Sequence, residues 1–346
     1  MPNLMPPSRT SVDKAGRILR RVNAQSEDFD FALDILSQWR SLHSYPVNAM
    51  KVLIRRHTAK AYPEAIVAQR LKRFASIVDK LGRYPSMSLA KMQDIGGLRV
   101  VLSTADDVYN LHNTLVCNSS HQARLPAADY IFKPKADGYR SVHQVFRYKS
   151  RSHPELDGMR VEVQIRSKLQ HAWATAVETL GVITKMSLKT GQGSDEAKAY
   201  FRLASALFSL DENSPVLEEY KDAAPGLLVE ELDALDASLQ FSGKIRMLAK
   251  SIKAIDTSFR KSAYQLLELD TRRNRANIVG FSKQQLDYAE QLYLSREQDN
   301  RNNGHISVVL IGVGELNAIK AAYPNYFLDA NLFLDNLERV SKIYRK

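Results

Sequence analysis

Apolar residues along the first eighty positions recur with the spacing of amphipathic helices. Phe31, Ile35, Leu36 and Trp39 show this period, and it continues to Leu81, so the pattern predicts an α-helical entry from about residue 11 to 82. After the turn at 83–86 the period shortens. Three β-type runs follow, at Leu98–Leu102, Ser141–Tyr148 and Met159–Arg166. A helical piece from Ala105 to about Leu115 lies between the first two of them. Strands interleaved with helices predict an α+β fold, a mixed β-sheet flanked by helices.

The second half of the chain begins with helices, the first predicted over Lys168–Ile183, and these continue to about Thr257. A new alternation then predicts a second, smaller α+β domain. Its expected elements are strands at Tyr264–Leu269, Asn277–Phe281 and His305–Val313, a helix over Ser282–Glu297 with Ser282 as N-cap, and a closing helix over Asp329–Ile343. We therefore expect two domains, 1–257 and 258–346.

Composition narrows the environment and the partners. The 346 residues are 44% apolar and include one cysteine, which excludes an internal disulfide and suits a reducing cytoplasm. No apolar run reaches the roughly 18 residues of a membrane span, so no membrane association is expected. The formal net charge of +11 favours polyanionic partners. Much of it lies in two segments, Lys51–Lys91 and Lys133–Arg151, although solvated basic helix faces would also explain them.

The first basic segment contains a repeat that suits a polyphosphate. If Arg70 to Lys80 is helical, Lys72, Ser76 and Lys80 recur every fourth residue and lie along one face. Two ammonium groups with a hydroxyl between them match phosphate groups, and Arg70 adds a planar guanidinium. An ordinary amphipathic helix is the alternative interpretation.

A second candidate site combines two carboxylates. Strict alternation in Met159–Arg166 places Arg160, Glu162, Gln164 and Arg166 on one strand face, which usually means solvent. Asp94, just before the apolar strand Leu98–Leu102, offers a second carboxylate from a neighbouring strand end. Mg²⁺ typically binds one or two carboxylates with water and substrate phosphate. We therefore predict Asp94 and Glu162 as a metal-binding pair.

Cations and aromatic rings surround a Pro/Gly turn in the segment 129–143. Tyr139 follows Gly138, and alternation places Ser141 and His143 on its side of the next strand, so a ring, a hydroxyl and an imidazole can face a nucleotide base. Tyr139 as a packing residue and His143 as a structural histidine are the alternatives. The chain has neither a P-loop nor a Gly-x-Gly-x-x-Gly dinucleotide motif in a suitable strand-helix unit.

Taken in order, these motifs resemble the synthetase domain of RelA/SpoT homologues, the ATP-dependent pyrophosphokinases. The resemblance runs from about Arg70 to Glu178. It rests on five ordered blocks: Arg70-x-Lys72 with Ser76 and Lys80, Asp94-Ile-Gly-Gly-Leu-Arg99, Lys133-Pro-Lys135, Gly138-Tyr139-Arg140-Ser141-x-His143, and Glu162-Val-Gln164-Ile-Arg166.

The resemblance implies a role for each block. Asp94 and Glu162 would be catalytic and hold Mg²⁺. ATP, the pyrophosphate donor, would be bound by Arg70, Lys72, Ser76, Lys80 and Arg99. The acceptor would be bound by Lys135, Tyr139, His143, Gln164 and Arg166. Glu162 could serve as metal ligand or as base, and the sequence leaves both roles open.

Departures from the long enzymes bear on the acceptor. Asp137 stands where housekeeping synthetases usually carry Asn, and a carboxylate cannot donate to guanine. The segment 169–178 resembles the toxic small alarmone synthetases, and the region beyond Thr257 resembles the pseudo-zinc-finger antitoxin domain of CapRel-type fused toxin-antitoxin proteins. That resemblance implies pyrophosphate transfer to the 3′-hydroxyl of the tRNA CCA end, which stops translation in anti-phage defence.

The same resemblance implies control by the C-terminal domain until a phage capsid protein binds it. The regulatory knob would be formed by Tyr323, Pro324, Tyr326 and Phe327, which could instead simply pack within their own domain. Neither DNA nor a membrane is expected as a partner. Two other functions stay open: a (p)ppGpp synthetase that uses GDP or GTP, and an inactive nucleotide- or RNA-binding module.

Overall fold

The computed structural model describes residues 6–20, 27–72, 74–118, 121–187, 194–247, 262–270, 272–273, 275–300, 306–312 and 326–345. The chain forms two compact units. The first comprises residues 1–131 and 141–168, and the second comprises 132–140 and 169–346. The predicted boundary at 257 falls outside the described residues and stays a prediction.

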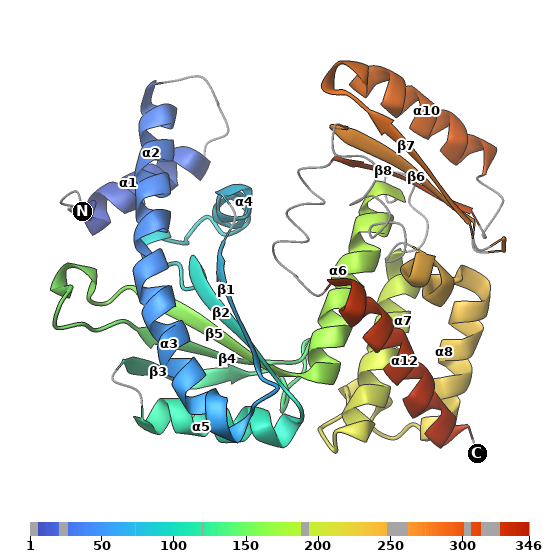
Figure 1. Ribbon diagram of the computed structural model, residues 1–346, viewed down its shortest axis with the longest axis horizontal. Coiled ribbons are helices and arrows are strands. Elements are labelled where there is room, and N and C mark those ends of the chain that lie inside the picture. Colours follow the sequence, from blue (N-terminus) through green and yellow to red (C-terminus); the bar gives the residue numbers. More distant parts are fainter. Residues whose placement is uncertain are drawn as a thin grey trace. The chain divides into compact units, whose positions relative to one another are not determined.

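Five α-helices belong to the first unit: α1 (Arg9–Arg20), α2 (Glu27–Leu42), α3 (Ser44–Ala61), α4 (Phe74–Arg83) and α5 (Ala105–Asn118). Short 3-10 helices cover Leu89–Lys91 and Pro154–Leu156. In α1, Val12, Ala15 and Leu19 recur every three to four residues and are buried with Leu36 of α2 and Ile77 of α4. This apolar cluster joins α1, α2 and α4, which are labelled in Figure 1.

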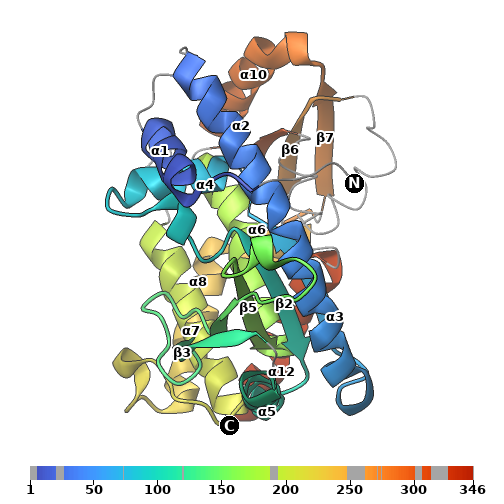
Figure 2. The ribbon, with the colours of Figure 1, turned by 90° about the vertical axis from the view of Figure 1, so that its left-hand side faces the viewer.

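A five-stranded sheet in the order β1-β2-β5-β4-β3 forms the centre of this unit. Its strands are β1 (Ile66–Leu71), β2 (Gly96–Leu102), β3 (Gln122–Asp129), β4 (Val142–Arg147) and β5 (Arg160–Ser167). β2 and β5 run parallel, and the other neighbours run antiparallel, so the predicted mixed sheet is confirmed. Figure 2 shows α3 and α5 beside it.

Two edge strands were missed by the sequence pattern. β1 lies inside the segment that was predicted to be helical. Its six residues are half-buried or exposed without the alternation that marks a strand, so the pattern gave no signal for it. β3 contains Pro126 and an irregular register between Arg124 and Ala128, and proline in a sheet is confined to edges and bulges. The strands β2, β4 and β5 and helix α5 were predicted within a few residues.

One face of the sheet is apolar and covered. Val100 of β2 and Val163 of β5 pack with Met50 and Ile54 of α3 and with Leu111 of α5, all of them fully or almost fully buried. β5 alternates between apolar and polar residues because successive side chains of a strand point to opposite faces, and only one face packs against α3 and α5. The opposite face therefore receives the polar residues.

The second unit combines a helical core with a small sheet. Its α-helices are α6 (Lys168–Ser187, beginning at the unit border), α7 (Ser194–Asp211), α8 (Pro225–Leu239), α10 (Leu286–Asp299) and α12 (Tyr326–Tyr344), with 3-10 helices at Glu218–Tyr220 and Lys283–Gln285. Trp173, Tyr200, Phe208 and Phe333 are among its buried aromatic residues. Figure 1 shows α12 alongside α7 and α8.

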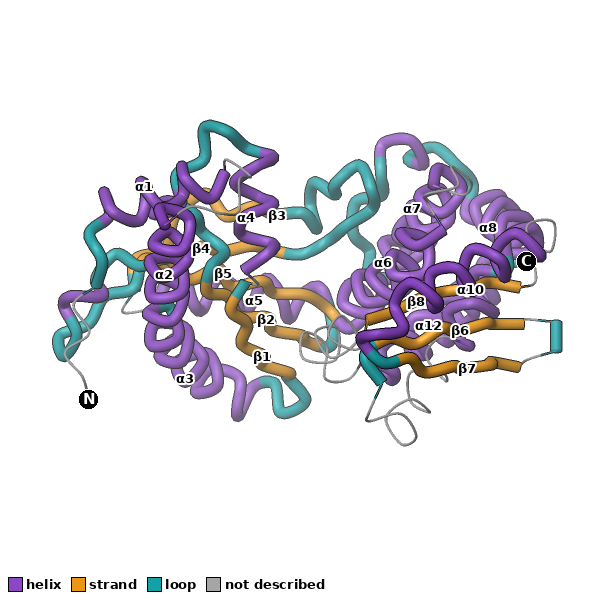
Figure 3. Tube along the Cα trace, turned by 90° about the horizontal axis from the view of Figure 1, so that it is seen from above, coloured by secondary structure: helices purple, strands orange, loops and turns teal. Residues whose placement is uncertain are grey.

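The small sheet has the order β7-β6-β8, with β6 (Tyr264–Asp270), β7 (Arg275–Phe281) and β8 (Ile306–Gly312) antiparallel throughout (Figure 3). Ala289 of α10 packs with Leu266 and Phe281 on one face, and Leu267 joins the helical core. The three predicted strands and the two helices of this region are confirmed. Its assignment as a pseudo-zinc finger stays a prediction. Tyr323, Pro324 and the side chains of Tyr326 and Phe327 lie outside the described residues.

Candidate active site

The face of the five-stranded sheet opposite α3 and α5 carries polar side chains in two neighbouring rows. Gly97 of β2 lies opposite Arg70 of β1 and opposite Glu162 of β5. One step along, Gln164 lies opposite both Arg99 of β2 and His143 of β4. Directly opposite residues project to the same side of a sheet. The register thus places these predicted site residues on one surface, although they are distant in sequence.

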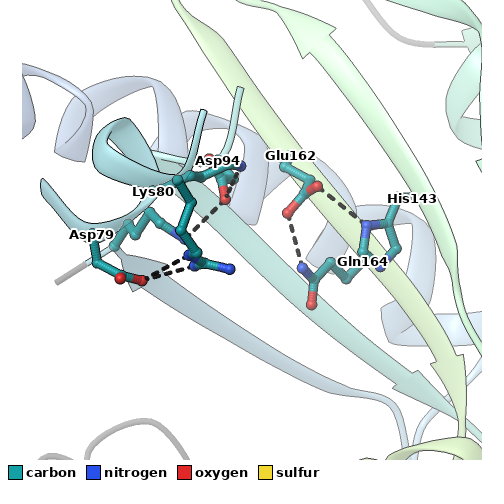
Figure 4. Close-up of polar contacts among 8 residues, drawn as sticks. Asp79, Lys80, Asp94, His143, Glu162 and Gln164 are labelled. Carbon is teal, nitrogen blue, oxygen red and sulfur yellow. Dashed lines mark hydrogen bonds and ion pairs between the residues drawn. The ribbon is translucent and has the colours of Figure 1, made fainter. Parts of the chain in front are cut away.

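Both carboxylate oxygens of Glu162 have a hydrogen-bond partner, as Figure 4 shows. His143 Nδ1 lies 3.2 Å from Oε1, and Gln164 Nε2 donates to Oε2 at 2.8 Å. Arg166 Nη2 in turn donates to Gln164 Oε1 at 2.8 Å. Burial raises the pKa of Glu162, but His143 and Gln164 more than offset this, so the pKa lies below its usual value. Glu162 is therefore an ionised and oriented carboxylate at neutral pH.

Asp94 lies in the segment just before β2 and contacts two lysines. Its Oδ2 atom accepts from Lys72 Nζ at 3.0 Å and from Lys80 Nζ at 2.9 Å (Figure 4 labels Lys80). Burial raises the pKa of Asp94, yet the two ammonium groups outweigh it and lower the pKa. Among the described residues, nothing donates a hydrogen bond to the buried Oδ1 atom.

The two lysines that contact Asp94 do not lie on one helix, although the sequence pattern predicted that they would. Arg70 lies in β1, Lys72 follows that strand, and α4 begins only at Phe74, so the prediction of one helix carrying all of them was wrong. Ladder hydrogen bonds between β1 and β2 favour the extended form over a helix here. Ser76 and Lys80 do share one face of α4.

Mg²⁺ is implied by the acid pair, and the residues present fit it. Asp94 and Glu162 are close enough that the Asp94 charge acts to raise the pKa of Glu162. Asp94 Oδ1 is a buried oxygen without a protein partner among the described residues. Among these residues, no group of three or more His, Cys, Asp or Glu could hold a metal ion. Two carboxylates suit an ion that also binds water and substrate phosphate, rather than a closed protein cage.

Lys135 and Tyr139 lie on the loop 132–140, which belongs to the second unit. Lys135 Nζ lies 4.9 Å from the centroid of the Tyr139 ring, and Asp137 Oδ1 accepts from the Tyr139 N–H at 3.0 Å. Asp137 therefore stabilises the turn that presents the ring. The joint action of Lys135 and Tyr139 with His143 on an acceptor stays a prediction.

Some supporting residues carry no local signal in the sequence. The backbone of Lys72 is held from two sides, because its N–H donates to Ile95 O and its carbonyl accepts from Arg40 Nε, each at 2.8 Å. Arg40 belongs to α2, far from the motif. Within the second unit, Ser205 and Trp173 lie against Gly138. Only the tertiary contacts identify them as positioning residues.

The chain is similar to known proteins over this region. A family model described as "Region found in RelA / SpoT proteins" matches residues 69–191. The GTP pyrophosphokinase YwaC of Bacillus subtilis (strain 168) is 32% identical over 152 residues, which are 42% of this chain and 68% of that protein. The GTP pyrophosphokinase YjbM of the same organism is 33% identical over 120 residues, 34% of this chain and 56% of that protein.

Solved structures show a similar match. The small alarmone synthetase 1 from Bacillus subtilis bound to its product pppGpp is 26% identical, with a TM-score of 0.44, over 51% of this chain and 94% of that chain. A GTP pyrophosphokinase family protein from Streptococcus pneumoniae is 27% identical, with a TM-score of 0.42, over 59% of this chain and 98% of that chain.

No described helix is both long and apolar enough to cross a membrane.

Proposed function

Because this chain belongs to the RelA/SpoT family of pyrophosphokinases, we propose that it transfers the β,γ-pyrophosphoryl group of ATP to the 3′-hydroxyl of a nucleotide acceptor. The observation that carries this proposal is the grouping of two ionised carboxylates with two lysines: Asp94 contacts Lys72 and Lys80, and its charge acts on Glu162. Such transfers need charge neutralisation and in-line positioning more than covalent help from the protein.

The triphosphate end of ATP is assigned to the lysine pair. Lys72 and Lys80 both contact Asp94, and both ammonium groups suit phosphate oxygens. Arg70 and Arg99 belong to the same face of the sheet, and Ser76 lies one turn before Lys80 on α4. Mg²⁺, held by Asp94 and Glu162, would neutralise phosphate charge when bound.

Glu162 also has the properties of a general base. In the proposed step the acceptor 3′-oxygen attacks the β-phosphorus of ATP while the bond from that phosphorus to the α,β-bridging oxygen breaks. AMP leaves with the bridging oxygen, and the proton of the acceptor hydroxyl passes to a Glu162 carboxylate oxygen. His143 and Gln164 hold that carboxylate in one orientation, because each contacts a different oxygen.

For the acceptor we favour the 3′-terminal adenosine of the tRNA CCA end. Arg55, Arg56 and Lys60 are exposed on α3, and Lys133 and Lys135 are exposed on the loop 132–140, which suits a phosphate backbone. The Asp137 carboxylate accepts from the Tyr139 N–H and has no donor to offer guanine. Transfer to tRNA would block aminoacylation and stop translation.

A guanosine acceptor is the second candidate, supported by the two curated relatives, which are both GTP pyrophosphokinases. Incubation of the protein, together with any required activator, with γ-labelled ATP and either bulk tRNA or GDP and GTP separates the candidates. Label in tRNA is the expected result. Label confined to guanosine tetra- or pentaphosphate would exclude the tRNA acceptor. Bound ATP without label in either acceptor would support an inactive binding module instead.

Regulation and partners are proposed on the resemblance of residues 258–346 alone. The C-terminal domain, with its Tyr323–Phe327 knob, would inhibit transfer until a phage capsid protein binds it, as part of anti-phage defence in the cytoplasm. Titration of the full chain with purified capsid protein should raise tRNA labelling several-fold. Equal labelling with and without the capsid protein would contradict this proposal.

A further inference from the structure

The loop that carries Lys135 and Tyr139 is anchored at Gly138 by two helices of its own unit. Gly138 has φ +93°, and a side chain there would meet Ser205 and the Trp173 ring at 3.0 and 3.2 Å. Ser205 Oγ donates to the Gly138 carbonyl at 2.6 Å and accepts from Arg140 Nε at 3.1 Å. One buried hydroxyl therefore contacts both sides of Tyr139.

Aromatic rings connect α6 to α7, and α7 to the C-terminal helix α12. Trp173 of α6 donates from Nε1 to the Phe201 carbonyl of α7 at 2.8 Å, and its ring centroid lies 6.0 Å from that of Phe201. Phe333 of α12 lies 5.8 Å from Phe201 and 5.7 Å from Phe208, and it is fully buried. Close-packed rings transmit displacement, because a protein core has few voids to absorb it.

Helix α12 is fastened to its neighbours at two further points. Arg339 donates to both oxygens of Asp211, at the end of α7, at 3.0 and 2.6 Å. Arg345, the residue after α12, forms a similar fork with Asp233 of α8, in which Nη2 donates to Oδ1 at 2.8 Å and Nε donates to Oδ2 at 3.1 Å. Paired N–H···O bonds of this kind fix orientation as well as distance. The register of α12 on α7 is thus set by polar contacts that can be changed without altering the core.

We propose that α12 positions the loop 132–140 for acceptor binding. Phe333 of α12 and Ser205 of α7 are the positioning residues. Docked α12 supports Phe201 through Phe333, and Phe201 packs against Trp173. Trp173 in turn lies against Gly138 and so helps to set the placement of Tyr139 and Lys135. The inference rests on the proposed acceptor role of Tyr139. It separates the C-terminal region into two parts, because the part of α12 from Phe333 onwards supports the acceptor loop while the residues before it are available for inhibition. Deleting residues 258–346 would therefore remove support as well as any inhibitor.

Steady-state transfer by the full chain tests the proposal, with tRNA and GDP each varied at saturating ATP. Phe333→Ala should raise the acceptor KM about tenfold, equivalent to ~1.4 kcal/mol. ATP affinity, measured by nucleotide titration, should change less than about twofold. A general loss of folded protein would not raise the acceptor KM while leaving ATP affinity unchanged. Leu332→Ala, at an exposed neighbour on the same helix, is the matched control and should leave both values unchanged.

A second set of variants leaves the core intact. Arg339→Asp and Asp211→Arg should each raise the acceptor KM, and the double variant, which restores an ion pair with its charges exchanged, should recover most of the loss. Folded Phe333→Ala and Arg339→Asp proteins with wild-type acceptor KM would overturn the proposal. Failure of the double variant to recover would also count against it.

Two controls separate this inference from the proposed function. If Tyr139→Ala leaves the acceptor KM unchanged, the acceptor assignment is wrong. If Tyr139→Ala raises it while the α12 variants do not, only the role of α12 is wrong. Independently of catalysis, Trp39→Phe leaves Trp173 as the one tryptophan of the chain. Arg339→Asp should then shift Trp173 emission to the red, and an unchanged spectrum would contradict the coupling.

Discussion

Replacing Asp94 by Asn tests the assignment of Lys72 and Lys80 to the phosphates of ATP. Both ammonium nitrogens lie within 3.0 Å of the same oxygen, so they are at most 6 Å apart. At about 6 Å and an effective dielectric constant near 20, two like charges repel by about 3 kcal/mol. In the native protein Asp94 offsets this repulsion, and Asn cannot.

The variant should therefore lose stability and gain phosphate affinity together. We expect the free energy of unfolding to fall by about 2–3 kcal/mol. This is less than the roughly 3–5 kcal/mol for one partner of a fully buried pair, because these side chains are 13–26% exposed. The released charge should strengthen metal-free ATP binding about tenfold, while transfer in Mg²⁺ should be lost.

Urea denaturation and ATP titration in EDTA measure the two quantities. Asp79→Asn is the matched control, because Asp79 pairs with Arg83 on the exposed side of α4 and the substitution makes the same change of charge. It should leave stability within about 0.5 kcal/mol and ATP binding unchanged. A folded Asp94→Asn protein that loses metal-free ATP binding would refute the assignment of the lysines to phosphate.

Three other substitutions examine the base, the core and a buried histidine. Glu162→Gln should reduce transfer by about 10²–10⁴ while ATP still binds, as judged by single-turnover labelling, and retained transfer would exclude the base role. Gly96→Ala would place a Cβ 2.6 Å from Val47 Cγ2, and chemical denaturation should show a loss of about 1–3 kcal/mol. Burial lowers the pKa of His43 to about 4 from 6.5, so its neutral form contributes stability above pH 6.5 that is lost as the pH falls towards 4. Urea titrations should show a loss of about 2 kcal/mol from this group between pH 7.5 and 5, a slope that His43→Phe should abolish.

The elements that the sequence predicted correctly have their signal within a few residues. β5 alternates because its apolar side chains pack under α3 and α5, and its polar side chains form the site. The alternation alone was therefore enough to place Glu162, Gln164 and Arg166 on one face. The order of the RelA/SpoT motifs identified the family by the same local information.

Residues whose role depends on distant partners were not predictable in this way. β1 was taken for a helix because its strand state depends on hydrogen bonds to β2, about thirty residues further along the chain. Lys72 consequently reaches Asp94 from the end of a strand, and Arg40 fixes its backbone from another helix.

Local periodicity determined which side chains face solvent and which face the core, because that choice depends on backbone geometry and polarity alone. The tertiary structure decided which of those faces meet. It bonded Asp94 to two lysines, set His143 against Glu162, and anchored the Gly138 turn on Ser205 and Trp173. Contacts between residues tens of positions apart form only when whole packed surfaces fit together, and a short window of sequence does not contain that information.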